Sequence, residues 1–259
     1  MSISRQFTSA RENLNEKVFH FFYEESLNNK ALSLIMNKVN LFDFSNIYAF
    51  GGVVRDIELK NKPSDIDLVF NGYRDDFDLL IESLNGERII KNKFGGFRIE
   101  TSQLDIDLWF FKDTWALLNN KIDDTNNRID DLLKTTFFNW DAVLFDFKNK
   151  DIICDKYYYQ CLNNRHLDIN LVDNPNTLGS FSRIIKNIFH NNAIYLSEEI
   201  VNYLEKSFSD YSFSEIREFY LSKNQEYDLQ LRNLISLYDR VNTRIEYSTK
   251  LKSTIEVDK

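Results

Sequence analysis

The sequence has few glycines, prolines and cysteines, and it has no long hydrophobic run. With 7 Gly and 2 Pro in 259 residues, it lacks the composition of a collagen-like or turn-dense all-β chain. Its two cysteines, Cys154 and Cys161, are too few for a disulfide framework or a cysteine zinc site. We interpret them as reduced thiols of a cytoplasmic protein. No stretch of about 18 apolar residues occurs, which predicts no transmembrane helix and no membrane partner. The charged N-terminus predicts no signal peptide.

Positive charge is also scarce. The chain contains 32 Lys and Arg against 40 Asp and Glu, a formal net charge of -8. The parts before and after residue 165 are both acidic, and no basic arm or tail is evident. This excludes nucleic-acid binding through a bulk basic surface, although an RNA substrate bound through few contacts stays compatible with it.

Hydrophobic periodicity predicts a mixed region followed by a helical one. Residues 8–40 predict two helices, and short strands are predicted at 47–50, 65–70, 88–90, 96–100 and 104–110. After about residue 155, five segments have helical spacing: 157–162, 178–190, 197–208, 212–221 and 226–245. We therefore expect an α+β protein, with a mixed sheet and flanking helices over residues 1–165 and an all-helical domain over 166–259.

Two glycines followed by a pair of acids form the most specific motif. Gly51–Asp56 (Gly-Gly-Val-Val-Arg-Asp) follows a predicted strand and opens a predicted helix, so it offers backbone N–H groups and a positive helix end to phosphate oxygens. The next strand carries Asp65 and Asp67, which point to one side because they are two residues apart. Two adjacent carboxylates suit Mg²⁺ carrying a triphosphate.

A second pair of acids, Asp105 and Asp107, lies on the predicted strand 104–110. Both would face one side of that strand, so strand geometry allows either as a third carboxylate. Taken alone, a Gly-Gly is usually a turn and an Asp-x-Asp is usually a solvated strand face. It is their order along the chain that indicates a functional site: strand, Gly-Gly, helix, strand with two acids, then a further strand with an acid.

These residues resemble a known family. Gly51-Gly52-x-Val54-Arg55-Asp56 with Asp65-x-Asp67 is similar to the head domain of class II tRNA nucleotidyltransferases (CCA-adding enzymes) and bacterial poly(A) polymerases, in the DNA polymerase β-like superfamily. Thr136–Ala142 occupies the place of that family's Arg-Asp-Phe-Thr-x-Asn-Ala motif, and 143–155 resembles the hairpin that follows. Residues 174–186 fall where the family begins its helical neck. The resemblance favours Asp107 over Asp105, because Ile106-Asp107-Leu108-Trp109 matches a single acid framed by apolar residues.

The sequence departs from the family pattern in two motifs. Thr136 and Phe137 replace an Arg-Asp pair, and Gly179-Ser180-x-x-Arg183 keeps only the arginine of the family's base-reading Glu-Asp-x-x-Arg. We therefore expect relaxed selection of the base. Little chain follows the neck, so we expect no full counterpart of the parts that grip tRNA in the family.

The resemblance implies a metal-dependent nucleotidyltransferase that transfers NMP from an NTP, ATP or CTP, to a hydroxyl acceptor. The acceptor expected first is an RNA 3′ end, with a protein or a small molecule as alternatives. Two Mg²⁺ ions, or Mn²⁺, would be held by three acids that are also the catalytic residues: Asp65, Asp67 and Asp107. The residues expected to bind the nucleotide are Gly51, Gly52, Arg55, Asn139 and Arg183. Two other interpretations stay open: a catalytically impaired nucleotide-binding or interaction module, and a toxin- or defence-type transferase that modifies RNA or protein.

Overall fold

The structure is a computed structural model that describes residues 3–92, 95–122, 128–173, 176–224, 228–247 and 255–256. The chain divides into two compact units. Unit 1 comprises Met1–Thr136 and Trp140–Tyr159, and unit 2 comprises Phe137–Asn139 and Gln160–Lys259. The domain boundary at residue 165 stays a prediction. The start of the predicted neck motif, residues 174 and 175, lies outside the described residues.

Unit 1 is built on a seven-stranded mixed sheet of order β3-β4-β5-β2-β1-β6-β7. Its strands are β1 (Asn46–Phe50), β2 (Ile66–Asn71), β3 (Arg88–Lys91), β4 (Phe97–Glu100), β5 (Ile106–Phe110), β6 (Val143–Asp146) and β7 (Asp151–Cys154). Only the β2–β5 pair is parallel among the paired strands of this sheet. The predicted strands between residues 47 and 110 are all present, and so is the predicted hairpin over 143–155.

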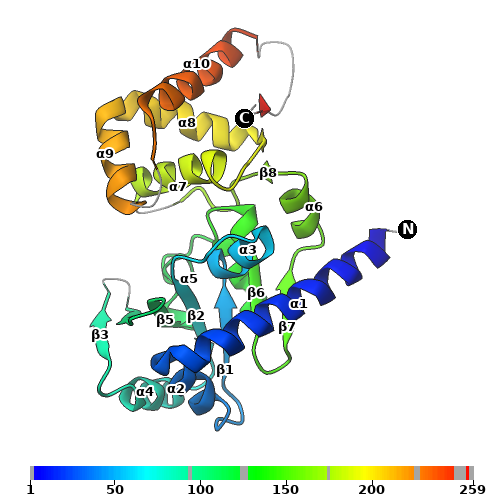
Figure 1. Ribbon diagram of the computed structural model, residues 1–259, viewed down its shortest axis with the longest axis vertical. Helices are drawn as coiled ribbons and strands as arrows, with labels where there is room; N and C mark the ends of the chain where they lie inside the picture. Colours follow the sequence, from blue (N-terminus) through cyan, green and yellow to red (C-terminus); the bar gives the residue numbers. More distant parts are fainter. Residues whose placement is uncertain are drawn as a thin grey trace. The chain divides into compact units, whose positions relative to one another are not determined.

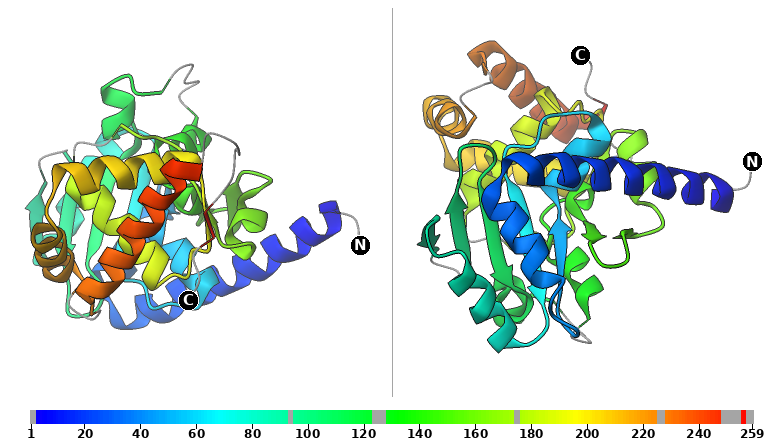
Figure 2. Two further views of the ribbon diagram at one scale, coloured as in Figure 1. Left: turned by 90° about the horizontal axis from the view of Figure 1, so that it is seen from above. Right: turned by 60° about the horizontal axis from the view of Figure 1, so that its bottom comes forward.

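Helices cover both faces of this sheet. The α-helices are α1 (Ile3–Asn28), α2 (Lys30–Val39), α3 (Gly52–Leu59), α4 (Arg74–Ser83) and α5 (Trp115–Leu118), and the 3₁₀ helices are η1 (Phe111–Asp113), η2 (Ile129–Thr135) and η3 (Asn139–Asp141). Figures 1 and 2 show α1, α2 and α3 over one face. On the other face, Tyr48, Val69 and Leu144 pack with Phe111 of η1 and Leu132 of η2 in a buried cluster.

Unit 2 is mainly helical. It contains most of α6 (Tyr158–Asn163), together with α7 (Thr177–Phe189), α8 (Glu198–Asp210), α9 (Phe213–Lys223) and α10 (Leu231–Tyr247). Contrary to the expectation of helices alone, it also has a small sheet of order β10-β9-β8, formed by the two-residue strands β8 (His166–Leu167), β9 (Tyr195–Leu196) and β10 (Ile255–Glu256). The α+β class, with a sheet-based head and a helical region after it, is confirmed.

In the part of the chain that the structure describes, no helix combines the length and the hydropathy needed to cross a lipid bilayer.

Candidate active site

One end of the unit 1 sheet collects the acids and glycines that the sequence singled out. Strand β1 runs antiparallel to β2, with Ala49 opposite Leu68, so the end of β1 lies beside the start of β2. Strand β5 runs parallel to β2, so its first residues reach the same end. Gly51 therefore follows β1 at the end of the sheet where the acids of β2 and β5 lie.

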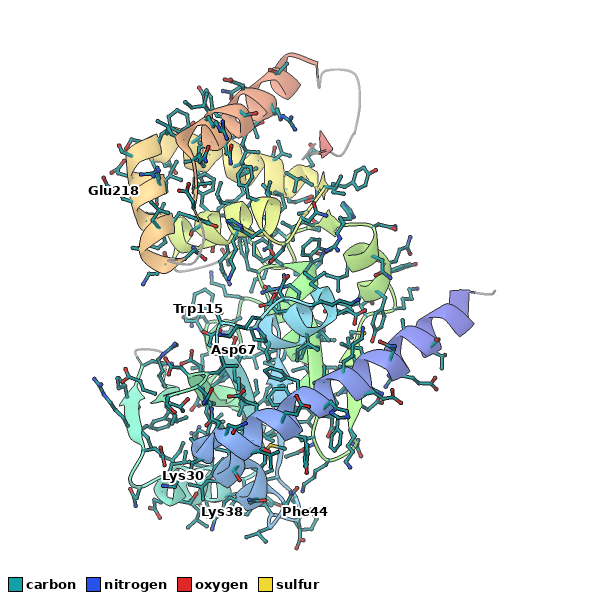
Figure 3. The ribbon with its side chains drawn as sticks, in the orientation of Figure 1. Lys30, Lys38, Phe44, Asp67, Trp115 and Glu218 are labelled. Carbon is teal, nitrogen blue, oxygen red and sulfur yellow. The ribbon has the colours of Figure 1, made fainter. Side chains whose placement is uncertain are left out.

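A charged row crosses three strands at this end. Asp67 of β2 is in register with Asp107 of β5, and Asp107 is in turn opposite Arg98 of β4. Residues directly opposite each other in a sheet point to the same face. Figure 3 shows where Asp67 lies on the ribbon. The next pair on this face, Val69 and Trp109, belongs to the apolar cluster under η1 and η2, so the charged row borders a packed region.

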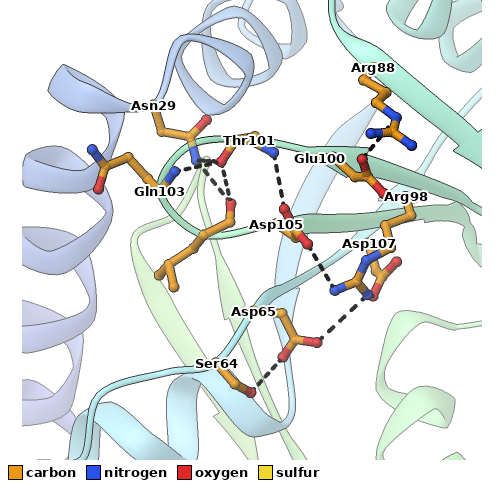
Figure 4. Close-up of polar contacts among 11 residues, drawn as sticks. Asn29, Ser64, Asp65, Arg88, Arg98, Glu100, Thr101, Gln103, Asp105 and Asp107 are labelled. Carbon is orange, nitrogen blue, oxygen red and sulfur yellow. Dashed lines mark hydrogen bonds and ion pairs between the residues drawn. The ribbon is translucent and has the colours of Figure 1, made fainter. Parts of the chain in front are cut away.

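Arg98 holds Asp107 of β5 and Asp105, just before β5, through ion pairs (Figure 4). Its Nη1 donates to Asp107 Oδ2 at 2.6 Å, and its Nη2 donates to Asp105 Oδ2 at 3.2 Å. The same Nη1 lies 3.9 Å from Asp65 Oδ2. The other oxygen of Asp105 accepts the Thr101 backbone N–H at 3.0 Å. Both Asp105 oxygens are therefore engaged, one by Arg98 and one by the backbone.

The charges of this cluster influence one another. Burial raises the pKa of Asp107, Arg98 counteracts that rise, and Asp65 and Asp105 add to it, so the pKa of Asp107 lies above its usual value. Burial alone would lower the pKa of Arg98, but Asp107, Asp105 and Asp65 reverse the effect and raise it. The acids thus crowd like charges together, and the arginine compensates them only in part.

The donor chemistry at this end fits a hard divalent cation in part. Asp65 and Asp67 precede or begin β2 and supply carboxylate oxygens, the ligand type that Mg²⁺ prefers. Across the described ranges, however, no group of three or more His, Cys, Asp or Glu side chains is placed to hold a metal ion. Within the same cluster, the Arg98 guanidinium takes the Asp107 oxygen Oδ2 as its ion-pair partner.

The two glycines shape the turn from β1 into α3. Gly51 is buried at φ +67°, a conformation that favours glycine, and a Cβ there would lie 3.5 Å from the Asp141 carbonyl oxygen. Its N–H donates to the Val143 carbonyl at 3.0 Å, so this N–H belongs to the pairing with β6. Gly52 is the first residue of α3. Their phosphate contacts stay predictions.

Arg55 differs from its predicted role. It is 9% exposed, and its guanidinium pairs with Asp141 and, at 2.9 Å, with Asp56. Burial opposes the charge of Arg55, but Asp141 and Asp56 raise its pKa well above the usual value. The guanidinium lies beneath the glycine turn, since a Cβ on Gly52 would be 3.5 Å from Arg55 Nη2. A contact with phosphate would require these ion pairs to open.

The two remaining predicted nucleotide contacts lie in unit 2. Asn139 donates its amide to the His166 carbonyl at 3.1 Å and accepts the Asp168 N–H at 3.0 Å, so both ends of the side chain join two backbone segments. Arg183 is an exposed residue of α7, with its guanidinium 5.4 Å and 5.7 Å from the ring centres of Phe137 and Phe138. Phe137, which stands where the resembled family has an acid, thus packs against the Arg183 guanidinium. A base contact of Arg183 stays a prediction.

The sequence interpretation weighed Arg98 as a phosphate contact beside Gly95 and Gly96, favoured a solvated hairpin turn instead, and so left Arg98 out of the predicted site. Nothing in its local sequence marks it, and its partners Asp105 and Asp107 lie just before β5 and within β5. The available signal was the short hairpin between residues 98 and 107, because a seven- to nine-residue separation places an arginine across from both acids. Reading that signal requires knowing how β4 and β5 are aligned, and the sequence alone does not give this register.

Comparison with solved structures connects this fold to tRNA-processing enzymes. A CCA-adding enzyme in complex with CTP matches at a TM-score of 0.56 and 19% identity, over 89% of this chain and 56% of that one. The Thermotoga maritima CCA-adding enzyme complexed with tRNA matches at 0.55 and 19%, over 85% and 53%. A tRNA nucleotidyltransferase complexed with a primer tRNA and an incoming ATP analogue matches at 0.53 and 14%, over 77% and 58%.

These similarities concern the fold. The chain spans about half the length of the solved structures that it matches. No protein-family model matches the sequence, and no curated protein matches it at a significant level. The resemblance inferred from the Gly-Gly and Asp-x-Asp motifs is confirmed at the level of structure.

Proposed function

Because the chain has the fold of CCA-adding enzymes and tRNA nucleotidyltransferases, we propose that it is a metal-dependent nucleotidyltransferase. It transfers NMP from an NTP to a hydroxyl acceptor. The observation that carries the proposal is the sheet end in unit 1, where Asp65, Asp67 and Asp107 lie at the same end as the Gly51–Gly52 turn that opens α3. Acids beside a helix N-terminus suit a triphosphate with its metal ion.

In this proposal Asp65 and Asp67 hold Mg²⁺, or Mn²⁺ in its place. The ion would neutralise charge on the phosphates and favour in-line attack of a hydroxyl on the α-phosphorus. The chain's own part is positioning: the α3 N-terminus attracts the triphosphate, and the rigid strands hold the acids at fixed spacing. The predicted role of Asp107 as a third metal ligand stays a prediction, since Arg98 is its partner in the structure.

The substrates proposed are ATP or CTP and an RNA 3′ end. Structural neighbours were solved with CTP, with ATP and with tRNA, which supports this choice over a protein or small-molecule acceptor. Arg183 on its phenylalanine platform is the proposed base contact in unit 2. Since only this arginine of the base-reading motif remains, transfer is expected from more than one NTP.

A second candidate is a nucleotide-binding module without turnover. Three observations favour it. Asp107 is ion-paired with Arg98, and Arg55 is ion-paired with Asp56 inside the protein. Both polar atoms of the Asn139 amide are hydrogen-bonded to backbone groups. The presence of Asp65 just before β2 and of Asp67 within it argues for the enzyme instead.

A transfer assay with labelled NTPs separates the two candidates. Purified protein is incubated with each α-labelled NTP, Mg²⁺ and total RNA or cell lysate, and the label is followed onto RNA or protein. Asp65→Asn and Asp67→Asn should each lower transfer by about 10²–10³-fold, as expected for loss of a transition-state electrostatic contact. Asp78→Asn is the matched control, because Asp78 is an exposed acid of α4 in the same unit.

Binding without transfer would favour the module. Ligand-induced stabilisation that survives both substitutions would show that these acids are only a solvated strand face, and the transferase proposal would then be wrong.

A further inference from the structure

Arg98 is positioned by the sheet itself. Antiparallel pairing of β4 with β5 sets Arg98 opposite Asp107, and Asp105 lies two residues earlier on the same side. The guanidinium donates one N–H group to each of these acids, at 2.6 Å and 3.2 Å. A planar fork of donors matches two carboxylates, which an ammonium group could not do equally well.

Further contacts of Asp105 and Asp65 fix the position of the Arg98 guanidinium. Asp105 is itself fixed by the Thr101 backbone N–H at 3.0 Å, so the guanidinium cannot swing freely away from β5. Asp65 approaches the same Nη1 to 3.9 Å from the segment before β2. One permanent positive charge therefore lies among three carboxylates at the proposed catalytic end of the sheet (Figure 4).

A second cation at Asp107 would compete with this arginine. A magnesium ligand must approach its ion to about 2.0–2.1 Å, and Oδ2 of Asp107 already accepts the Arg98 N–H. Arginine cannot escape the conflict by losing its proton, because it stays protonated in proteins. A divalent ion and the guanidinium would repel each other across this carboxylate, which lies 2.6 Å from Arg98 Nη1, more strongly than at Asp65, which lies 3.9 Å from the same atom.

We propose that Arg98 occupies the place of a second metal ion, so that the site binds one divalent cation through Asp65 and Asp67 while Asp107 stays paired with Arg98. This inference rests on the proposed function for the location of the site. It makes Arg98 a positioning residue that sets the number of metal ions. It also gives Asp107 a role in holding the arginine.

Counting bound Mn²⁺ tests the inference without any transfer reaction. Equilibrium dialysis with electron paramagnetic resonance at fixed ionic strength, with and without ATP, should find one Mn²⁺ per wild-type chain. Arg98→Gln should bind two, because Asp107 is released. Arg98→Gln combined with Asp107→Asn should return to one, and Asp65→Asn should lose the ion of the wild-type protein.

The control is Arg88→Gln. Arg88 of β3 pairs with Glu100 at 2.9 Å and is more exposed than Arg98, so its loss removes the same charge from the sheet without touching Asp65, Asp105 or Asp107. It should keep one Mn²⁺. A change of stoichiometry in this control would assign the effect to net charge and overturn the inference.

Other outcomes would also overturn it. These are zero or two Mn²⁺ on the wild-type chain, or one Mn²⁺ on a folded Arg98→Gln. Should Arg98→Gln fail to fold, Asp107→Asn alone decides: its Mn²⁺ affinity should stay within about twofold of wild type, whereas a loss of about tenfold, the size expected for a lost ligand partner, contradicts the inference. If Mn²⁺ counts agree but no NTP is ever transferred, the proposed function fails and the role of Arg98 stands.

Discussion

Two arginines of unit 1 have the same kind of partners but different surroundings. Arg55 pairs with Asp56 and Asp141, and Arg98 pairs with Asp105 and Asp107. The Arg55 side chain is 11% exposed, whereas that of Arg98 is 38% exposed. The motif pointed to Arg55 as the phosphate contact, yet the more exposed arginine is the one among the candidate catalytic acids.

Burial explains what each arginine does. Arg55 joins α3 to Asp141 just before β6, and so it fixes the glycine turn from inside the protein. Removing one member of a buried pair leaves a charge without compensation or contact with water. Arg98 is still reached by water, so its ion pairs contribute little to folding but determine which cations the acids can accept. Equal ion-pair partners therefore do not imply equal roles.

The largest expected effect on stability comes from replacing the buried arginine, Arg55. Arg55→Met should lower the free energy of unfolding by about 3–5 kcal/mol, because the buried Asp56 and the half-buried Asp141 both lose the positive charge that compensates them. Urea denaturation followed by circular dichroism measures this. The control, Arg88→Met, breaks an exposed pair with Glu100 and should change stability by about 1 kcal/mol or less. Similar values for the two variants would remove the distinction drawn from burial.

Alkaline pH should lower the free energy of unfolding through the groups around Cys154. Burial raises the pKa of Cys154 to about 12, and it also raises the pKa of Tyr158 and Tyr159, which lie beside it. A group with a raised pKa contributes stability that is present below its unfolded pKa, about 8.5 for cysteine, and that is lost as pH rises toward the folded value. The loss reaches at most about 1.4 kcal/mol per pH unit for one group.

Urea denaturation at pH 8 and pH 10 tests this prediction. Cys154→Ala should lose less stability between the two pH values than the wild-type chain does. Cys161→Ala, the other thiol, should follow the wild type. Identical pH dependence of both variants would show that the Cys154 thiol ionises as readily in the folded as in the unfolded chain.

The smallest expected effect on stability comes from replacing the more exposed arginine, Arg98. Arg98→Gln should change the free energy of unfolding by about 1 kcal/mol or less, since its side chain is 38% exposed and water can replace its contacts. The same denaturation measurement checks it in metal-free buffer. A loss of stability as large as that of Arg55→Met would show that Arg98 stabilises the fold as much as the buried arginine does, and exposure would then not separate the two roles.

Much of unit 1 was predictable because its signals are local. Alternation of acidic and apolar residues predicted β2 and β5, and the two glycines predicted the break between β1 and α3. The parallel register of Asp67 and Asp107 then agrees with acids facing the same way on both strands. The small sheet in unit 2 was missed, because strands of two residues have no periodicity to detect.

The roles of individual charged residues were less predictable. Arg55 follows two glycines in a phosphate-binding pattern, but its ion-pair partner Asp141 lies 86 residues further along the chain. Asn139 stands in a motif position, yet its partners in unit 2 are backbone groups at His166 and Asp168. Neither set of partners leaves a trace in the local sequence.

By itself, the sequence determined the α+β order of elements, the glycine turn and the common side of the acids on each strand, because these depend on side-chain periodicity and on backbone freedom within a few residues. Only the tertiary structure decided which arginine is buried and which one lies among the acids. That decision depends on strand register and on the exclusion of water, and both arise when segments far apart in the chain pack together.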